Sequence, residues 1–203
     1  MSPTSSRRRS RARVPTVWVV AGPPGSGKST LGRALAKAAG AVLLDQDVAT
    51  NPLMQSIADL VGAGDDLDHP ALRGPVRAAR YQCLLDIAVD NRRIGRSVVM
   101  VAPFTSEIRD PAAFDALAAQ LSPARVLLVW VTVPPEVALA RRLRRNLPRD
   151  RAADLSAVPA ATEQVPPPAV PHLAADGAAE SGAEAARLVA QAGPATRTGT
   201  PAG

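Results

Sequence analysis

The chain has 203 residues, of which 46% are hydrophobic and 21% are charged. This length and balance fit a single α/β domain with disordered ends and leave no room for a second full domain. Aromatic residues make up only 2% of the chain, so the core must be built from Val, Leu and Ala. The single cysteine, Cys83, excludes an internal disulfide, agrees with a reducing compartment and is expected in the core.

The net charge of +6 comes largely from the first residues of the chain. Five arginines lie within residues 7–13, and the rest of the chain is close to neutral. We therefore interpret residues 1–14 as a disordered basic tail and not as a nucleic-acid-binding arm. The apolar run behind this tail leads straight into a glycine-rich motif, which argues against a cleaved signal peptide. No apolar run is long enough to span a bilayer, and the prediction is a cytoplasmic protein.

The first predicted element is the apolar run TVWVVA at residues 16–21, followed by a glycine-rich turn and an amphipathic helix that Gly40 ends. A second apolar run, at residues 41–47, ends in two acids. A long helix is predicted over residues 75–94, and Gly95 would stop it. Its expected buried stripe consists of Val76, Ala79, Cys83, Ile87 and Ile94.

Two further apolar strands are predicted at residues 96–104 and 124–133, with an arginine-rich helix from residue 136. After an Ala/Pro-rich loop at about 152–169, a short strand and a last helix are expected before the tail at 193–203. These strands are apolar throughout and alternate with helices. That pattern is typical of a parallel sheet covered on both faces.

The turn after the first strand carries the best-defined motif. Gly22, Gly27, Lys28 and Ser29 match G-x-x-x-x-G-K-[ST], the phosphate-binding P-loop, between the strand and the helix that such a loop requires. Lys28 is expected at the β- and γ-phosphates, and the Ser29 hydroxyl at Mg²⁺. The predicted ATP-binding residues of this segment are Gly22, Gly25, Ser26, Gly27, Lys28, Ser29 and Thr30.

Many P-loop enzymes hold Mg²⁺ with a second carboxylate at the end of another strand. In VVMVAPF that place is taken by Val101, whereas Asp45 and Asp47 end the second strand. Across the pleat of a strand, a D-x-D pair would direct both carboxylates to the edge where the P-loop opens. We predict Asp45 as a water-mediated Mg²⁺ ligand and Asp47 as the catalytic base. The alternative is that one or both cap the next helix.

The motif GPPGSGKST, the D-x-D, VVMVAPF and RRLRRNLPRD together resemble the P-loop small-molecule kinases, such as shikimate and gluconate kinases. The segment VVMVAPFTSEIRDP, followed by LVWV and PRD, is similar to segments of bacterial AAA-family ATP-binding proteins with a kinase-like domain. The resemblance spans about residues 15–192. It implies a three-layer αβα sandwich with a five-stranded parallel sheet in the order 2-3-1-4-5, and it implies ATP and Mg²⁺.

The same resemblance implies an arginine-bearing lid at about residues 136–151 that closes over ATP. Arg141 and Arg145 would offset charge on the transferring phosphoryl group, and Arg149 would bind the nucleotide. The alternative is a solvated basic helix face. Asp176 falls where related kinases place their adenine-contacting loop.

Two groups of residues are candidates for the acceptor site. Arg73, Arg77 and Arg80 follow helical spacing and would suit an anionic acceptor. Thr105, Glu107 and Arg109 follow the third strand, at the edge where open α/β sheets bind ligands, and we favour this second group. The predicted substrate residues are Asp47, Arg73, Arg77, Thr105 and Arg109. The acids and the histidine of GDDLDH, at residues 64–69, are interpreted as turn and cap residues and not as a metal site.

The predicted function is therefore transfer of the γ-phosphate of ATP to a hydroxyl of a small molecule, by a monomer or a homodimer. The alternative is a protein that hydrolyses or senses ATP without a phosphoryl acceptor, and Val101 is the main argument for it. A third hypothesis, a nucleic-acid-associated protein that uses the arginines of residues 7–13, is the least favoured.

Overall fold

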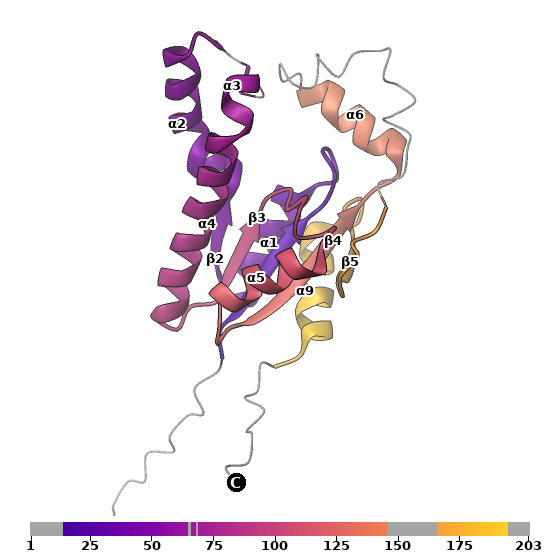
Figure 1. The fold of residues 1–203 in the computed structure, drawn as a ribbon. Helices are drawn as coiled ribbons and strands as arrows, with labels where there is room; N and C mark the ends of the chain where they lie inside the picture. Colours follow the sequence, from indigo (N-terminus) through magenta and orange to yellow (C-terminus); the bar gives the residue numbers. More distant parts are fainter. Residues whose placement is uncertain (1–13, 65, 68, 146–165, 195–203) are drawn as a thin grey trace, which may run out of the picture.

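The computed structural model describes residues 14–64, 66, 67, 69–145 and 166–194 (Figure 1). Its strands are β1 (Thr16–Ala21), β2 (Val42–Asp45), β3 (Val98–Val101), β4 (Arg125–Thr132) and β5 (Leu173–Asp176). Its helices are α1 (Lys28–Ala39), α2 (Gln46–Leu60), α3 (Pro70–Arg73), α4 (Pro75–Arg93), α5 (Pro111–Gln120), α6 (Pro135–Arg145) and α9 (Ser181–Ala192). The predicted alternation of apolar strands with helices is confirmed; α5 had not been located from the sequence.

The five strands form one parallel sheet in the order β2-β3-β1-β4-β5, as the kinase resemblance implied. Strand β1 lies at the centre, so the loop that leaves its carboxyl end opens between β3 and β4. The register places Asp45 opposite Val101 and Val101 opposite Val20. The ends of β1, β2 and β3 therefore meet at one edge of the sheet, where ligands of open α/β sheets bind.

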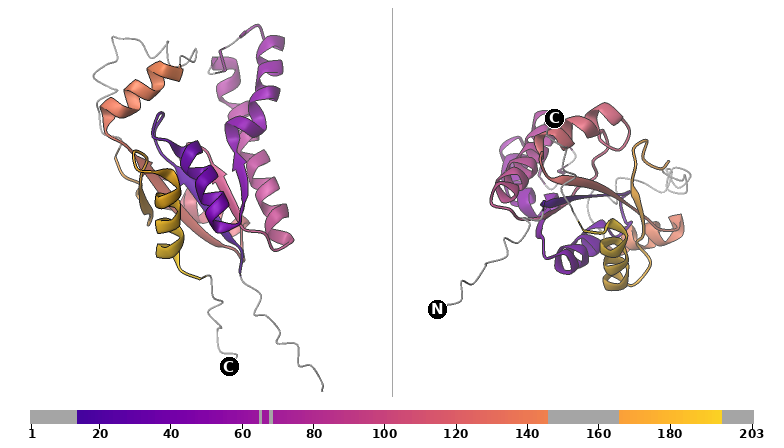
Figure 2. Two further views of the ribbon diagram at one scale, coloured as in Figure 1. Left: turned by 180° about the vertical axis from the view of Figure 1, so that it is seen from behind. Right: turned by 90° about the horizontal axis from the view of Figure 1, so that it is seen from below.

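Helices cover both faces of the sheet, as the views in Figure 2 show. On one face, Leu35 of α1 and Leu188 of α9 pack against Trp18 and its even-numbered neighbours along β1. On the other, helices α4 and α5 pack against the odd-numbered residues, among them Val19. Alternate residues of a strand point to opposite faces, so a wholly apolar strand supplies both cores. The predicted three-layer sandwich is confirmed.

The buried face of α4 differs from the predicted stripe. Ile87 is 37% exposed, Ile94 is 73% exposed, and Cys83 is only half-buried. Leu84 and Leu85 pack into the core instead. Both faces of this helix carry apolar residues at helical spacing, and burying two adjacent leucines removes more apolar surface from water. The predicted stripe, and with it the core position of Cys83, was wrong.

A break in the helix also separates Arg73 from Arg77 and Arg80. Helix α3 ends at Arg73 and α4 begins at Pro75, with Gly74 between them at φ −79° and ψ −88°. A proline disfavours helical geometry in the residue that precedes it, which explains a break at this point. Arg73 and Arg77 therefore lie on different helices, and the predicted single stripe of arginines does not form.

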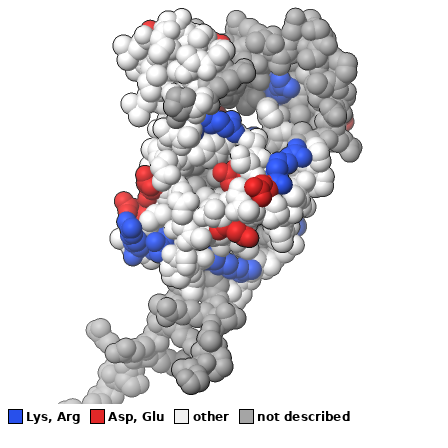
Figure 3. All heavy atoms as spheres, viewed as in Figure 1, with Lys and Arg blue, Asp and Glu red and all other residues white. Residues whose placement is uncertain are grey.

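Figure 3 shows basic and acidic side chains interspersed over the described part of one face of the molecule. The five arginines of residues 7–13 lie outside the described residues, as do most of the predicted tail at 193–203 and most of the Ala/Pro-rich loop. Over the ranges that the structure describes, no helix is long and apolar enough to cross a membrane.

Candidate functional site

A pocket of about 800 Å³ opens at the carboxyl end of the sheet. It is lined by the loop after β1, the first turns of α1 and α2, helices α4 and α6, and the turns that follow β3 and β5. Its volume lies within the range of small-molecule sites, which is about 300–1,000 Å³. Residues predicted for ATP, for metal and for substrate thus border one cavity.

The phosphate loop, residues 22–29, has the backbone geometry that its glycines allow. Gly25 has φ 83° and Gly27 has φ 94°, values that residues with a side chain rarely adopt. Gly27 caps α1, whose first amides have no partner within the helix and, with the helix dipole, favour a phosphate. Lys28 Nζ donates to the carbonyl oxygen of Pro23 at 3.0 Å, so the lysine bridges the loop.

Two neighbours hold the phosphate loop by close contact. A Cβ on Gly25 would lie 2.5 Å from the carbonyl oxygen of Ala138 in α6. A Cβ on Gly177, in the turn after β5, would overlap the carbonyl oxygen of Ser26. Ser26 itself is fully buried, and its hydroxyl has no hydrogen-bond partner among the described residues. Glycine is therefore required at position 25, where the loop meets α6, and at position 177, where the β5–α9 turn meets the loop.

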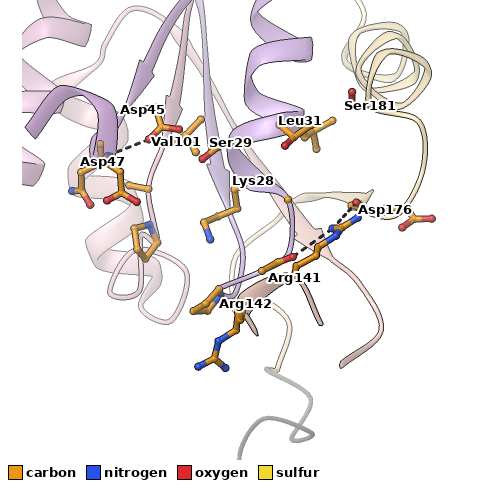
Figure 4. Close-up of a pocket in the computed structure, with 18 of the residues that line it drawn as sticks. Lys28, Ser29, Leu31, Asp45, Asp47, Val101, Arg141, Arg142, Asp176 and Ser181 are labelled. Atoms are coloured by element: carbon orange, nitrogen blue, oxygen red, sulfur yellow. Dashed lines mark hydrogen bonds between the residues drawn. The ribbon is translucent and has the colours of Figure 1, made fainter. Parts of the chain in front are cut away.

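Arg141 joins the same two segments. Its Nη1 donates to the carbonyl oxygen of Gly177 at 3.0 Å and lies 3.4 Å from that of Gly25. Figure 4 shows Lys28 between this arginine on one side and the Asp45–Asp47 pair on the other, with Asp176 near Arg141. Arg145 belongs to α6, but its side chain is outside the described part, and so is Arg149. The predicted roles of these arginines stay predictions.

Asp45 is the last residue of β2 and the N-cap of α2. Its Oδ1 accepts a hydrogen bond from the amide of Asp47 at 3.1 Å, which confirms the capping interpretation. The residue is only 6% exposed, and its Oδ2 is buried with no hydrogen-bond partner among the described residues. A buried carboxylate oxygen costs free energy unless something donates to it. One oxygen of Asp45 thus caps the helix while the other is available to a ligand.

Val101 lies opposite Asp45 at the end of the adjacent strand. Its side chain packs closely against Gly32 of α1, and a Cβ on that glycine would overlap Val101 Cγ2. Val101 therefore fills apolar space between β3 and α1. At this edge of the sheet the strand-end carboxylate comes from β2.

Asp47 is a helix residue, contrary to the prediction that both acids end the strand. The strand stops at Asp45, so the carboxylates do not share a pleat, although both line the pocket. Asp47 Oδ1 accepts from Arg80 Nη2 at 2.9 Å. Arg80 also donates to Thr50 Oγ1 at 2.7 Å and to Asn51 Oδ1 at 2.9 Å. Through these contacts Arg80 of α4 holds the Asp47 carboxylate at the start of α2.

Arg77 stands beside Arg80 at the pocket. Its Nη2 donates to Thr105 Oγ1 at 2.6 Å, and its guanidinium lies over the Tyr81 ring, 5.4 Å from the ring centre. The Tyr81 hydroxyl accepts from the amide of Phe104 at 3.0 Å. Burial raises the pKa of the Tyr81 phenol above its usual range, against the opposing effect of Arg77, so the phenol is neutral at physiological pH. We call Asp47, Arg77, Arg80 and Tyr81 the acceptor wall.

The two predicted acceptor groups have different places in the structure. Arg77 lines the pocket, whereas Thr105 reaches it only through Arg77, and Arg109 is exposed on the turn after β3, away from the lining. The side chain of Arg73 is outside the described part. Sequence reasoning assigned no site role to Tyr81, although it is the one tyrosine of the chain and lies four residues after Arg77, the spacing at which helical side chains meet.

The residues present fit a magnesium ion. Mg²⁺ is usually bound through one or two carboxylates together with substrate phosphates and several waters, and not by a cage of protein ligands. Ser29 and Asp45 both line the pocket, and the buried Oδ2 of Asp45 needs a donor such as a metal-bound water. Over the described residues, no group of three His, Cys, Asp or Glu side chains is placed to hold a metal.

The predicted cap chemistry of residues 64–69 is confirmed at one position. His69 Nδ1 accepts from the amide of Ala71 at 3.3 Å and caps α3. Asp65 and Asp68 lie outside the described residues.

Solved structures of the same fold include several kinases. A kinase-like protein from Chloroflexus aurantiacus is 21% identical, with a TM-score of 0.65 over 89% of this chain and 98% of that one. A gluconokinase from Sinorhizobium meliloti is 21% identical, with a TM-score of 0.50 over 89% and 97%. The APS kinase of Mycobacterium tuberculosis, solved with AMPPNP and APS, is 18% identical, with a TM-score of 0.52 over 87% and 95%. At these identities the likeness concerns the fold.

No curated protein matches the chain in sequence. The AAA domain family, in contrast, matches residues 17–168, which is more than half of the chain. The chain belongs to the AAA domain family and is a P-loop enzyme of the ATP-dependent kinase or ATPase type.

Proposed function

We propose that the protein is a kinase that transfers the γ-phosphoryl group of ATP to a hydroxyl of a small molecule. The observation that carries this proposal is that Asp47, fixed by Arg80, faces the same pocket as the phosphate loop. Because Asp47 stands on a wall of the pocket away from the loop, an acceptor hydroxyl has room between this carboxylate and the phosphates. The gluconokinase and the APS kinase of the same fold support a small-molecule acceptor.

In this proposal the phosphate loop and the N-terminus of α1 hold the phosphates, and Lys28 contacts the β- and γ-phosphates. The acceptor hydroxyl oxygen forms a bond to the γ-phosphorus. The bond from that phosphorus to the β–γ bridging oxygen breaks, and its electron pair leaves with ADP. Asp47 takes the proton of the hydroxyl, while Arg141 and Arg145 would offset charge on the transferring phosphoryl group and Arg149 would bind the nucleotide.

Ser29 and Asp45 would hold Mg²⁺ in this scheme. The ion would neutralise charge on the β- and γ-phosphates when bound. The hydroxyl of Ser29 lies at the first turn of α1, and Asp45 Oδ2 would accept a hydrogen bond from a metal-bound water. Asp45, at the end of β2, would thus supply the carboxylate at this edge of the sheet, where β3 ends in Val101.

Val101 favours a second candidate function, a nucleotide-hydrolysing or nucleotide-sensing protein without an acceptor. In that case neither Asp47 nor its network would matter for ATP turnover. The two functions therefore differ in what the loss of Asp47 does.

The test is Asp47→Asn, compared with Asp90→Asn, which breaks the exposed ion pair of Asp90 with Arg93 elsewhere on the molecule. A panel of hydroxylated metabolites with ATP and Mg²⁺ would be followed by phosphorus NMR. We expect Asp47→Asn to lower product formation by about 10²- to 10⁴-fold, the usual contribution of a general base, with ATP affinity unchanged. Asp90→Asn should behave as the wild type. Fast ATP hydrolysis without any phosphorylated product, untouched by Asp47→Asn, would reject the kinase in favour of the second function.

A further inference from the structure

We infer that the acceptor carries an oxyanion, a carboxylate or a phosphate, beside the hydroxyl that is phosphorylated, and that Arg77 binds it. This inference rests on the proposed function and names the substrate class of the same site. It follows from the balance of charge on the acceptor wall, from the way Arg77 is held, and from the neutral phenol beside it.

The charges of the acceptor wall are unequal. Asp47 carries one negative charge, and Arg80 compensates it through a 2.9 Å ion pair. Arg80 is also largely buried, since its side chain is 17% exposed, and it donates to two further oxygens of α2. Arg80 is thereby committed to positioning Asp47. None of the ion pairs among the described residues involves Arg77, and Glu107, whose negative charge acts on the neighbouring Tyr81, is not bonded to it, so the Arg77 guanidinium is available to a ligand.

Arg77 is held in place by neutral groups. Thr105 accepts from its Nη2, and the Tyr81 ring lies against its guanidinium. A guanidinium has five N–H donors, and a threonine hydroxyl and a ring face leave most of them for a ligand. Because the arginine is already oriented, little side-chain entropy remains to be lost when an oxyanion binds.

The turn that orients Arg77 is itself built with backbone strain. Phe104 is 1% exposed and has φ 46°, a left-handed conformation that is unfavourable for a residue with a side chain. Its amide donates to the Tyr81 hydroxyl, and the two rings meet edge to face at 5.6 Å. This packing places the next residue, Thr105, at Arg77. Unusual backbone geometry of this kind is often found at ligand sites.

The geometry suits a bifunctional acceptor. Arg77 and Arg80 lie one helical turn apart on α4, so an oxyanion at Arg77 would stand next to the carboxylate that Arg80 holds. A small molecule could then place its hydroxyl at Asp47 and its oxyanion at Arg77. A neutral polyol would leave the Arg77 guanidinium without a counter-charge in the loaded pocket.

The experiment uses matched acceptors that differ in charge: glucose, gluconate and glucose 6-phosphate, and glycerol, glycerate and glycerol 3-phosphate. The full chain is tested with ATP and Mg²⁺, and product is followed by phosphorus NMR. Binding is measured separately by calorimetry on protein loaded with the non-hydrolysable analogue AMPPNP. The variants are Arg77→Met, Arg77→Lys and the control Arg96→Met, whose exposed side chain lies beyond the opposite end of α4.

We expect phosphorylation of carboxylate or phosphate members in preference to the neutral member of each set, and the preferred member identifies the oxyanion. Arg77→Met should raise the KM and the Kd of that acceptor by about 10- to 100-fold, as expected for a lost charged hydrogen bond. Arg77→Lys should recover part of this loss, because lysine keeps the positive charge but lacks the planar guanidinium that binds an oxyanion through two hydrogen bonds. The KM of ATP and the thermal midpoint should stay unchanged, as should every parameter of Arg96→Met.

Two other outcomes overturn the inference in distinguishable ways. Neutral members phosphorylated as well as their anionic partners, with no effect of Arg77→Met, would leave the kinase standing and remove its oxyanion subsite. No product from any member, together with no binding to the AMPPNP-loaded protein, would count against the oxyanion subsite and the proposed function alike.

Discussion

The two halves of the pocket are built in different ways. The phosphate loop is one contiguous segment, and its shape comes from glycine backbone geometry and the start of α1. The acceptor wall joins side chains of α2 and α4 with the turn after β3, segments that are 28 to 33 residues apart in the chain. Nucleotide binding is therefore encoded locally, whereas in the proposed kinase the choice of acceptor would depend on a side-chain network that only the folded domain assembles.

This difference implies different tolerance to substitution. Backbone amides bind phosphate whatever the neighbouring side chains are, so most of the loop contributes through conformation. In the acceptor wall, the donors and acceptors belong to a few individual side chains, and Arg80 alone donates to three of the acceptors. A single change there can alter which acceptor binds without affecting the fold.

Within the donor half, the largest effect is expected from Lys28→Met, which removes the side chain that is proposed to contact the β- and γ-phosphates. The loss of a charge at the transferring phosphoryl group should lower kcat by about 10²- to 10³-fold. Lys37→Met, on the exposed side of the last turn of α1, is the control and should leave kcat unchanged. Steady-state ADP formation measures both. Retention of more than a tenth of the wild-type rate by Lys28→Met would break the distinction between the two halves.

Asp45→Asn tests whether Asp45, which lies between the phosphate loop and the acceptor wall, holds Mg²⁺ in addition to capping α2. Asparagine caps a helix about as well as aspartate, so α2 should be kept while the charge next to the metal is lost. We expect the Mg²⁺ concentration for half-maximal rate to rise about 10- to 100-fold, as for other residues that hold metal-bound ligands. The matched control is Asp110→Asn, because Asp110 caps α5 in the same way as Asp45 caps α2 but lies outside the pocket lining. An equal Mg²⁺ dependence in both variants would assign Asp45 to capping alone.

The sequence predicted the fold, and the place of the phosphate loop between β1 and α1, for a physical reason. Apolar strands, a glycine-rich turn and an amphipathic helix are local patterns, and their order restricts a parallel sheet to few topologies. The acceptor wall was predicted only in part. The pairing of Arg80 with Asp47, and the contact of Thr105 with Arg77, depend on how α2, α4 and the turn after β3 pack.

Two misses show the same limit at the level of single elements. The buried stripe of α4 was misassigned because two apolar faces compete on one helix, and only the sheet decides between Ile87 and Leu84. The position of Asp47 was misassigned because Asp45 caps a helix at once, so the strand ends two residues early. In both cases tertiary contacts or a cap prevailed over the simplest periodicity.

The smallest effect is expected at the scaffold behind the donor half. Glu184 is 7% exposed, accepts from Arg187 and from the amide of Asp176, and so supports the turn that carries Gly177 against the phosphate loop. The hydrogen bonds from Arg187, with that of the Asp176 amide, hold the pKa of Glu184 below its ordinary value of 4.5 despite its burial. Because the folded-state pKa is depressed, this stabilisation is fully present above the unfolded-state pKa. It is lost as the pH falls through the folded-state pKa.

Glu184→Gln should therefore lower the free energy of unfolding by about 1–2 kcal/mol at pH 7, the contribution of a charged hydrogen bond. The difference from wild type should shrink as the pH falls from the ordinary value of 4.5 through the lower folded-state pKa of Glu184, because the wild-type carboxylate becomes protonated. Chemical denaturation at several pH values measures this difference, with Asp115→Asn on the exposed side of α5 as the control. Since the contact supports the donor half, the KM of ATP should rise slightly and the acceptor KM should not move. A pH-independent difference would mean that Glu184 acts by packing and not by its charge.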